Sequence, residues 1–108
     1  PYVQRAFAKL GEWPQVYHTM NGPSEFHVVG VIKNWDVTAR LGEINVPTLV
    51  TTGRYDEATP LIGETVNKGI KGSKWVVFEN SAHLAHAEEP ERYMAVLGDF
   101  LAGVETKL

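Results

Sequence analysis

Two short polar segments of the sequence contain the residue types needed for acid–base chemistry. Residues 52–57 (TGRYDE) include Asp56, and residues 81–86 (SAHLAH) include His83. A carboxylate beside an imidazole holds the ring in one tautomer and stabilises its protonated form. The imidazole can then take a proton from a hydroxyl group, which makes that hydroxyl a better nucleophile. Asp56 and His83 are therefore predicted to be the acid and the base of a nucleophilic mechanism.

Each polar segment follows an apolar segment that predicts a buried strand. The first strand is expected over residues 44–53, with Pro47 near its start, and the second over residues 75–78. Apolar strands without alternation are typical of parallel sheets that are buried on both faces. Open α/β sheets carry their ligand sites at the carboxyl ends of the strands. We therefore expect Asp56 and His83 to meet at one edge of a parallel sheet.

Helical periodicity and turn residues predict the remaining elements. The clearest is a helix over residues 90–104, where apolar side chains recur at helical spacing. Thr59 and Pro60 predict the start of another helix, with the Thr59 hydroxyl capping it, and Gly72 predicts its end. Residues 26–32 fit a strand or a helix equally well. The other expected features are a helix over residues 2–10, a turn over 21–24, a short helix over 37–41 and a loop over 79–89.

The order strand, helix, strand, helix predicts an α/β fold with parallel strands joined by right-handed crossovers. Such strands need helices on both faces. The 108 residues offer too few helices, and no further clear strand, to complete the sheet. The chain also opens on Pro1, and its first methionine is Met20. These features indicate part of a larger domain, and they leave nicking, processing and truncation open as the reason.

The order of the acid and the histidine along the chain matches the α/β-hydrolase scheme, in which the nucleophile precedes both. The sequence has no Gly-x-Ser-x-Gly motif, and its serines are Ser24, Ser73 and Ser81. None of them follows a predicted strand with the flanking glycines that the sharp nucleophile turn requires. The serine nucleophile is therefore expected upstream of Pro1, in a missing or separate chain. These residues alone are expected to be inactive.

Five segments of the sequence resemble the proline iminopeptidase family, which includes prolyl aminopeptidases and amino-acid amidases. These serine hydrolases combine an α/β-hydrolase core with a helical cap. The resemblance covers nearly the whole chain and implies that residues 1–26 are the end of the cap and residues 27–108 the C-terminal part of the core. The matching segments are NGPSEF at 21–26, NWD at 34–36, VPTLV at 46–50, GRYDE at 53–57 and SAH at 81–83.

The resemblance also implies roles for four residues. Asp56 and His83 match the family's triad acid and base, while Glu25 and Glu57 match the glutamates that hold the free amino terminus of the substrate. Charge-assisted hydrogen bonds to an α-ammonium group contribute about 1.5–3 kcal/mol each. The implied activity is release of N-terminal amino acids, often proline, from peptides, or hydrolysis of amino-acid amides. No cofactor is expected, and the implied partner is an N-terminal segment with the serine and the oxyanion hole.

Composition and charge exclude several other classes of protein. With 44% apolar and 21% charged residues, the chain is typical of a globular unit. A net charge of −3 gives no basic surface for nucleic acid. No apolar run reaches the roughly 18 residues of a transmembrane helix, so no membrane partner is expected. The absence of cysteine excludes a thiol nucleophile and favours a reducing compartment, for which we predict the cytoplasm.

Other interpretations of the same residues stay open. Asp56 can cap a turn, Glu25 can be a solvated turn residue, and Glu57 can interact with a helix dipole. His83 and His86, followed by two glutamates, approach metal-ligand spacing, but no zinc signature is complete and no metal is expected. The alternative functions are other α/β-hydrolase chemistry, such as ester or epoxide hydrolysis, and a non-catalytic binding fragment.

Overall fold

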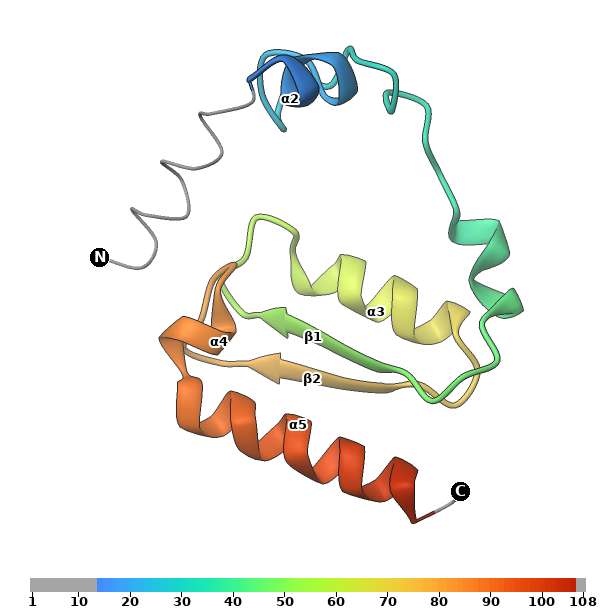
Figure 1. The fold of residues 1–108 in the computed structure, drawn as a ribbon, viewed down its shortest axis with the longest axis vertical. Coiled ribbons are helices and arrows are strands. Elements are labelled where there is room, and N and C mark those ends of the chain that lie inside the picture. The colour runs from blue at the N-terminus through green and yellow to red at the C-terminus, as the bar shows by residue number, and fades with distance from the viewer. Residues whose placement is uncertain (1–13, 107–108) are drawn as a thin grey trace. The chain divides into compact units, whose positions relative to one another are not determined.

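The computed structural model describes residues 14–106, which form two compact units divided between Asp36 and Val37 (Figure 1). The helix predicted over residues 2–10 lies outside the described residues. The predicted division into the end of a cap (residues 1–26) and a core (residues 27–108) stays a prediction.

The first unit begins with a short helix that ends in a tight turn. Helix α2 (Pro14–Met20) starts at a proline, whose fixed φ suits the first helical turn. The turn predicted over residues 21–24 is confirmed. Gly22 has a φ of 113°, which favours glycine, and a Cβ at this position would lie 2.8 Å from Val29 Cγ2. The turn therefore needs glycine for both its backbone angle and its close packing.

The apolar segment 26–32 folds back on this turn and forms neither a strand nor a helix. The Asn21 carbonyl accepts hydrogen bonds from the N–H groups of Val29 and Gly30, both at 2.8 Å. These bonds satisfy the backbone locally, which removes the need for a ladder or a helical turn. The apolar run is too short for its periodicity to predict this irregular conformation.

The second unit packs helices against a two-stranded parallel sheet. Figure 1 shows α3 on one side of the strands and α5 on the other. The strands pair in parallel from Leu49 opposite Lys74 to Gly53 opposite Phe78. The predicted α/β order is therefore confirmed. The elements are the 3-10 helix η1 (Thr38–Glu43), β1 (Leu49–Gly53), α3 (Pro60–Gly69), β2 (Lys74–Phe78), α4 (Ala85–Glu88) and α5 (Pro90–Glu105).

Strand β1 is shorter than predicted, because it begins at Leu49 instead of residue 44. Pro47 has no N–H to donate to a ladder, and the Lys74 N–H donates to the Thr48 carbonyl at 2.9 Å, just before the paired residues begin. The prediction that β1 is buried on both faces is wrong for the described part of the chain. Thr51 is exposed, and the residues before it are half-buried. A sheet of two strands leaves each strand with only one neighbour in this unit.

The predicted helices are present, with differences at their ends. Helix α3 begins at Pro60 as predicted, but the Thr59 hydroxyl makes no capping bond, and the Thr59 carbonyl accepts from the Ile62 N–H at 2.8 Å. The helix ends at Gly69, and Gly72, with a φ of 77°, lies in the following turn. The helix predicted at 37–41 is the 3-10 helix η1. No helix between residues 14 and 106 is long and apolar enough to cross a membrane.

The buried apolar core of the described residues is small. It consists of Leu41, Ile70, Phe78 and Ala85. Gly69 allows Leu41 to pack closely, since a Cβ at residue 69 would lie 2.6 Å from Leu41 Cδ1. Large apolar side chains that are at least half exposed are also found on both helices that cover the sheet, namely Leu61, Ile62, Met94 and Leu101.

Candidate active site

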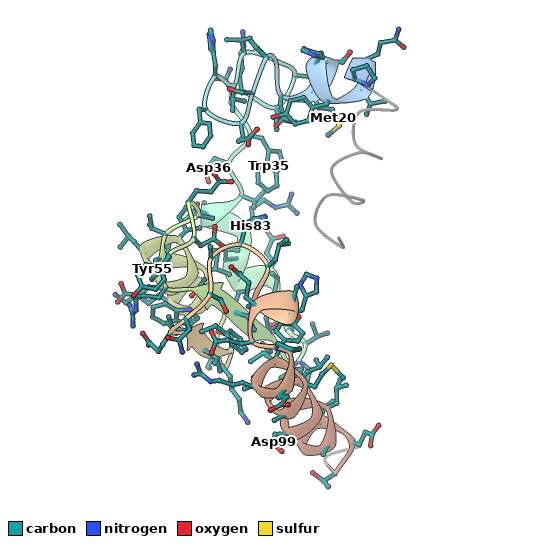
Figure 2. The ribbon with its side chains drawn as sticks, turned by 90° about the vertical axis from the view of Figure 1, so that its left-hand side faces the viewer. Met20, Trp35, Asp36, Tyr55, His83 and Asp99 are labelled. Atoms are coloured by element: carbon teal, nitrogen blue, oxygen red, sulfur yellow. The ribbon has the colours of Figure 1, made fainter. Side chains whose placement is uncertain are left out.

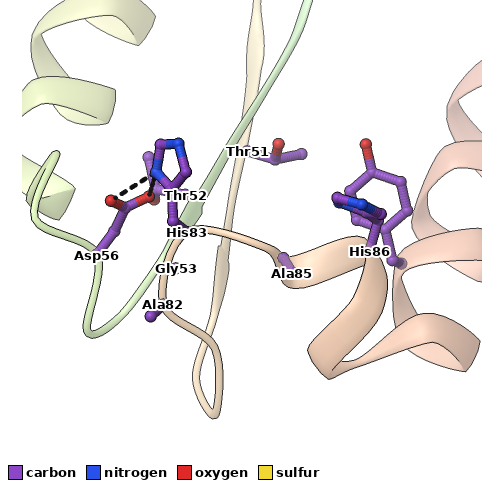
Figure 3. A pocket seen from close by; sticks show the side chains of 9 residues that line it. Thr51, Thr52, Gly53, Asp56, Ala82, His83, Ala85 and His86 are labelled. Carbon is purple, nitrogen blue, oxygen red and sulfur yellow. Dashed lines mark hydrogen bonds and ion pairs between the residues drawn. The ribbon is translucent and has the colours of Figure 1, made fainter. Parts of the chain in front are cut away.

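Asp56 and His83 lie together at the carboxyl ends of β1 and β2. His83 Nδ1 is 3.0 Å from Asp56 Oδ1 and 3.2 Å from Oδ2, as the dashed lines in Figure 3 show. The Ala58 N–H donates a second bond to Asp56 Oδ1 at 2.9 Å. Because a carboxylate only accepts, the neutral ring carries its proton on Nδ1 and keeps the lone pair of Nε2 free. This is the tautomer that a general base requires.

The two loops that carry these side chains are joined through their backbones. The Tyr55 N–H donates to the Ser81 carbonyl at 3.0 Å, and the Arg54 N–H donates to the Phe78 carbonyl at 2.9 Å. Gly53 makes the approach possible, because a Cβ there would lie 1.9 Å from the Ala82 carbonyl oxygen. The parallel register therefore continues past the strands and sets the distance between the acid and the histidine.

The loop before α4 is held by two adjacent carboxylates. Glu88 Oε2 accepts bonds from the N–H groups of Ala82 and Leu84, at 3.0 and 3.1 Å. Glu89 Oε2 accepts from the Asn80 N–H at 3.0 Å and from the Ser81 hydroxyl at 2.6 Å. The two glutamates that sequence reasoning considered as metal ligands instead satisfy backbone and hydroxyl donors of the loop.

The electrostatic surroundings of His83 favour its protonated form. The hydrogen bond that His83 donates to Asp56, and then the negative charge of Asp56, raise the pKa of His83 above the ordinary value of 6.5. The charges of Glu57 and Glu88 act in the same direction, while partial desolvation of the ring opposes them. The imidazole side chain is 67% exposed, whereas the Asp56 side chain is 10% exposed. The carboxylate is therefore fixed in place and the ring faces outward.

A pocket of about 120 Å³ opens beside the pair. Figure 3 shows Asp56 and His83 on one side of this pocket and His86 on the other, where its ring lies 6.0 Å from the Tyr93 ring. No group of three or more His, Asp or Glu side chains suited to a metal ion occurs in residues 14–106. The lining consists of Thr51, Thr52, Gly53, Asp56, Ala82, His83, Ala85, His86 and Tyr93.

The two glutamates predicted to bind the substrate's amine lie in different units. Glu57 is exposed directly after Asp56, and its charge acts on His83. Glu25 lies in the first unit, where the Tyr17 hydroxyl donates a hydrogen bond to it and lowers its pKa. The joint role of Glu25 and Glu57 stays a prediction.

Sequence reasoning missed the residues that support the site. It assigned no role to Gly53 and did not predict that Glu88 and Glu89 hold the histidine loop. The sequence signal for Glu88 and Glu89 was their placement between the histidine segment and the helix that starts at Pro90.

Figure 2 shows His83 toward one end of the second unit, whereas Asp99 on α5 lies toward the other.

These features define a class of protein. A parallel α/β unit that carries an acid after one strand and a histidine after the next corresponds to the C-terminal portion of an α/β-hydrolase fold. No family model matches the chain.

Comparison with known proteins agrees with this class. The chain is 48% identical over 99 residues to the proline iminopeptidase of Saccharolobus solfataricus, a match that covers 92% of this chain and 32% of the relative. It is 52% identical over 89 residues to the proline iminopeptidase of Heyndrickxia coagulans, covering 82% of this chain and 31% of the relative. A crystal structure of the Mycobacterium smegmatis proline iminopeptidase matches with a TM-score of 0.88 at 39% identity, covering 96% of this chain and 35% of that one.

The chain is thus related to the proline iminopeptidase family over nearly all of its own length. It spans about a third of the length of the relatives that it matches. The resemblance found in the sequence motifs is confirmed by these matches.

Proposed function

We propose that Asp56 and His83 are the acid and the base of a serine hydrolase that releases N-terminal amino acids, often proline, from peptides or hydrolyses amino-acid amides. The observation that carries the proposal is the hydrogen bond from His83 Nδ1 to Asp56, placed at the carboxyl ends of two parallel strands. The names of the relatives support the substrate class. We also propose a cytoplasmic location, which the lack of cysteine favours.

The serine and the oxyanion hole belong to a segment outside the 108 residues. His83 Nε2 takes the proton of the serine hydroxyl as its oxygen attacks the scissile carbonyl carbon. The imidazolium then gives this proton to the leaving amine as the acyl-serine forms. A water molecule, deprotonated by the same imidazole, releases the amino acid and restores the serine. Asp56 keeps the ring in one tautomer throughout and stabilises its charged form.

Glu25 and Glu57 bind the α-ammonium group of the substrate in this proposal. Two carboxylates beside one ammonium compensate its charge and disfavour substrates that lack it. The exposure of Glu57 next to Asp56 supports this role, because it leaves the carboxylate accessible beside the reacting group. The same charges make an ordinary ester or epoxide a poorer substrate than an aminoacyl amide.

The test is hydrolysis of aminoacyl arylamides by the complete enzyme. Glu25→Gln and Glu57→Gln are each expected to lower kcat/KM by roughly 10- to 100-fold, mostly through KM, because each removes one charge-assisted bond. An N-acetylated arylamide, which has no ammonium group, is expected to be a poor substrate. Glu105→Gln, an exposed glutamate at the end of α5, is the matched control and is expected to behave as wild type.

Two results would contradict the proposal. Equal turnover of free and N-acetylated arylamides would point to other α/β-hydrolase chemistry. No turnover of any amide or ester by the assembled protein would favour a non-catalytic binding role.

A further inference from the structure

The carboxylate of Glu88 contacts the backbone on both sides of His83. Its Oε2 accepts bonds from the Ala82 N–H at 3.0 Å and the Leu84 N–H at 3.1 Å. Asp56 contacts only the imidazole of the histidine, whereas Glu88 contacts the backbone N–H groups of the residues before and after it. The histidine is therefore fixed at two levels, the ring by one carboxylate and the main chain by another.

Glu88 also connects this backbone to helix α4. The Leu84 carbonyl accepts bonds from the N–H groups of Ala87 and Glu88, at 2.8 and 2.9 Å, while the Leu84 N–H donates to the Glu88 side chain. Leu84 is thus bonded to the same short helix through both of its backbone groups. A helix of four residues has little stability of its own, so the side-chain bonds of Glu88 help to hold it against the loop.

The neighbouring Glu89 holds the start of the same loop, before His83. It holds Asn80 and Ser81, and its carboxylate is bonded to Arg92 at 3.2 Å. Arg92 in turn donates to the Val77 carbonyl at 3.0 Å and lies 5.0 Å above the Phe78 ring. Glu89 therefore connects the start of the loop to β2 and α5, while Glu88 bonds the N–H groups of Ala82 and Leu84, the residues on either side of His83.

We propose that Glu88 is a positioning residue for His83, which holds the imidazole in its productive place through the backbone and contributes negative charge beside it. The proposal rests on the proposed function of His83 as the general base. A capping role limited to the stability of α4 is the competing explanation. The two are distinguished by whether the ionisation of His83 and the chemical step respond to the charge and the bonds of Glu88.

The charged and titratable groups near His83 determine how its pKa is expected to change when Glu88 is replaced. Asp56 and Glu57 face it from the β1–α3 loop, Glu88 faces it from α4, and His86 lines the same pocket. All three carboxylates raise the pKa of His83. Removing the charge of Glu88 is therefore expected to lower that pKa while the larger contribution of Asp56 remains.

Two substitutions separate the bonds of Glu88 from its charge. Glu88→Gln keeps an amide oxygen that can accept both N–H bonds but removes the charge. It is expected to keep kcat within about threefold of wild type at high pH and to move the acid limb of kcat/KM to lower pH. Glu88→Ala removes both, and it is expected to lower kcat by roughly 10- to 100-fold with little change in KM, because a small displacement of the base slows the chemical step.

The experiment uses the complete enzyme with prolyl arylamide as the substrate, together with ¹³C NMR titration of its histidines. The His83 signal is assigned as the one lost in His83→Gln. Glu91→Gln and Glu91→Ala, at an exposed glutamate in the first turn of α5, are the matched controls and are expected to change neither kcat nor the His83 pKa. If Glu88→Ala does not fold, the kinetics and the titration of Glu88→Gln decide.

The proposal is overturned if the His83 pKa stays at its wild-type value in Glu88→Gln, or if Glu88→Ala folds and keeps the wild-type kcat. A failure of the proposed function is a different result. In that case the wild-type enzyme hydrolyses no aminoacyl arylamide, while the NMR titration still measures whether Glu88 acts on His83.

Discussion

At the scale of single residues, Asp56 and His83 differ strongly in how much of each side chain is exposed. The Asp56 side chain is 10% exposed and receives bonds from both the Ala58 N–H and His83, whereas the His83 side chain is 67% exposed. A carboxylate that is already satisfied by fixed donors resists rotation, and an outward-facing ring keeps Nε2 accessible. The arrangement suits a base that must reach a hydroxyl group supplied from outside these residues.

The pH dependence of catalysis follows from this pair. Asp56 raises the pKa of His83, so the ring stays protonated to a higher pH, and the acid limb of kcat/KM is expected above pH 6.5. Asp56→Asn is expected to move that limb to lower pH and to reduce kcat by on the order of 10³–10⁴, because the preferred tautomer is lost. The measurement is a pH profile of arylamide hydrolysis by the complete enzyme.

Asp99→Asn makes the same chemical change on α5, away from the site (Figure 2), and serves as the matched control. It is expected to leave the limb in place. An acid limb that does not move in Asp56→Asn would show that the carboxylate does not control the ionisation of His83.

The pairing of Asp56 with His83 could be predicted from the sequence, but the contacts that hold their loops could not. Asp56 and His83 each follow an apolar strand, and strand ends meet at one edge of a parallel sheet. Glu88 and Glu89 act by contacting backbone N–H groups and a serine hydroxyl within the same loop. Such contacts depend on how the loop folds, and they leave no periodic pattern in the residue types.

At the scale of elements, the sequence predicted the type and order of the main strands and helices better than their ends. Helix α5 (Pro90–Glu105) matches its predicted range because many apolar side chains repeat along it. Strand β1 was predicted too long because apolar residues before Leu49 continue the pattern without pairing with β2. Helix α4 was missed because four residues give too little periodicity to detect.

Gly53, at the end of β1, allows the loops that carry Asp56 and His83 to approach each other closely. Its replacement tests whether this approach sets the geometry of the site. A Cβ at residue 53 would lie 1.9 Å from the Ala82 carbonyl oxygen and 2.5 Å from that of Ser81, so the two loops must move apart. Gly53→Ala is expected to lower the free energy of unfolding by about 1–3 kcal/mol, as overpacking generally does. It is also expected to reduce kcat, because Asp56 and His83 are carried by these loops. Denaturant unfolding and arylamide kinetics of the complete enzyme measure both effects.

Gly98→Ala is the matched control for this substitution. Gly98 lies within α5, and a Cβ there would meet nothing within 4 Å. Alanine in a helix interior is favoured over glycine, so this variant is expected to be more stable by about 0.5–1 kcal/mol with unchanged kcat. If Gly53→Ala behaved like Gly98→Ala, the close approach of the two loops would not be what sets the site.

At the scale of the whole molecule, the described residues contain more exposed apolar surface than their small core accounts for. Leu61 is 68% exposed, Met94 is 63% exposed and Val46 is 66% exposed, while only four apolar residues are buried among residues 14–106. Two parallel strands with one neighbour each have unpaired backbone groups along their other edges. This surface and these edges fit the proposal that further strands and helices of an α/β-hydrolase core pack here.

Activity is expected only when residues 1–108 are combined with the segment that carries the nucleophile. Residues 1–108 by themselves are expected to release no product from prolyl arylamide, since no nucleophile motif occurs in the sequence. A segment of about 150–200 residues with a Gly-x-Ser-x-Gly motif would complete a domain of ordinary size, and its addition is expected to produce activity that His83→Ala in this chain abolishes. Arylamide assays before and after mixing, with intact masses of every copurifying polypeptide, make the comparison. Turnover by residues 1–108 alone would mean that the nucleophile lies within them and that the assignment of an external serine is wrong.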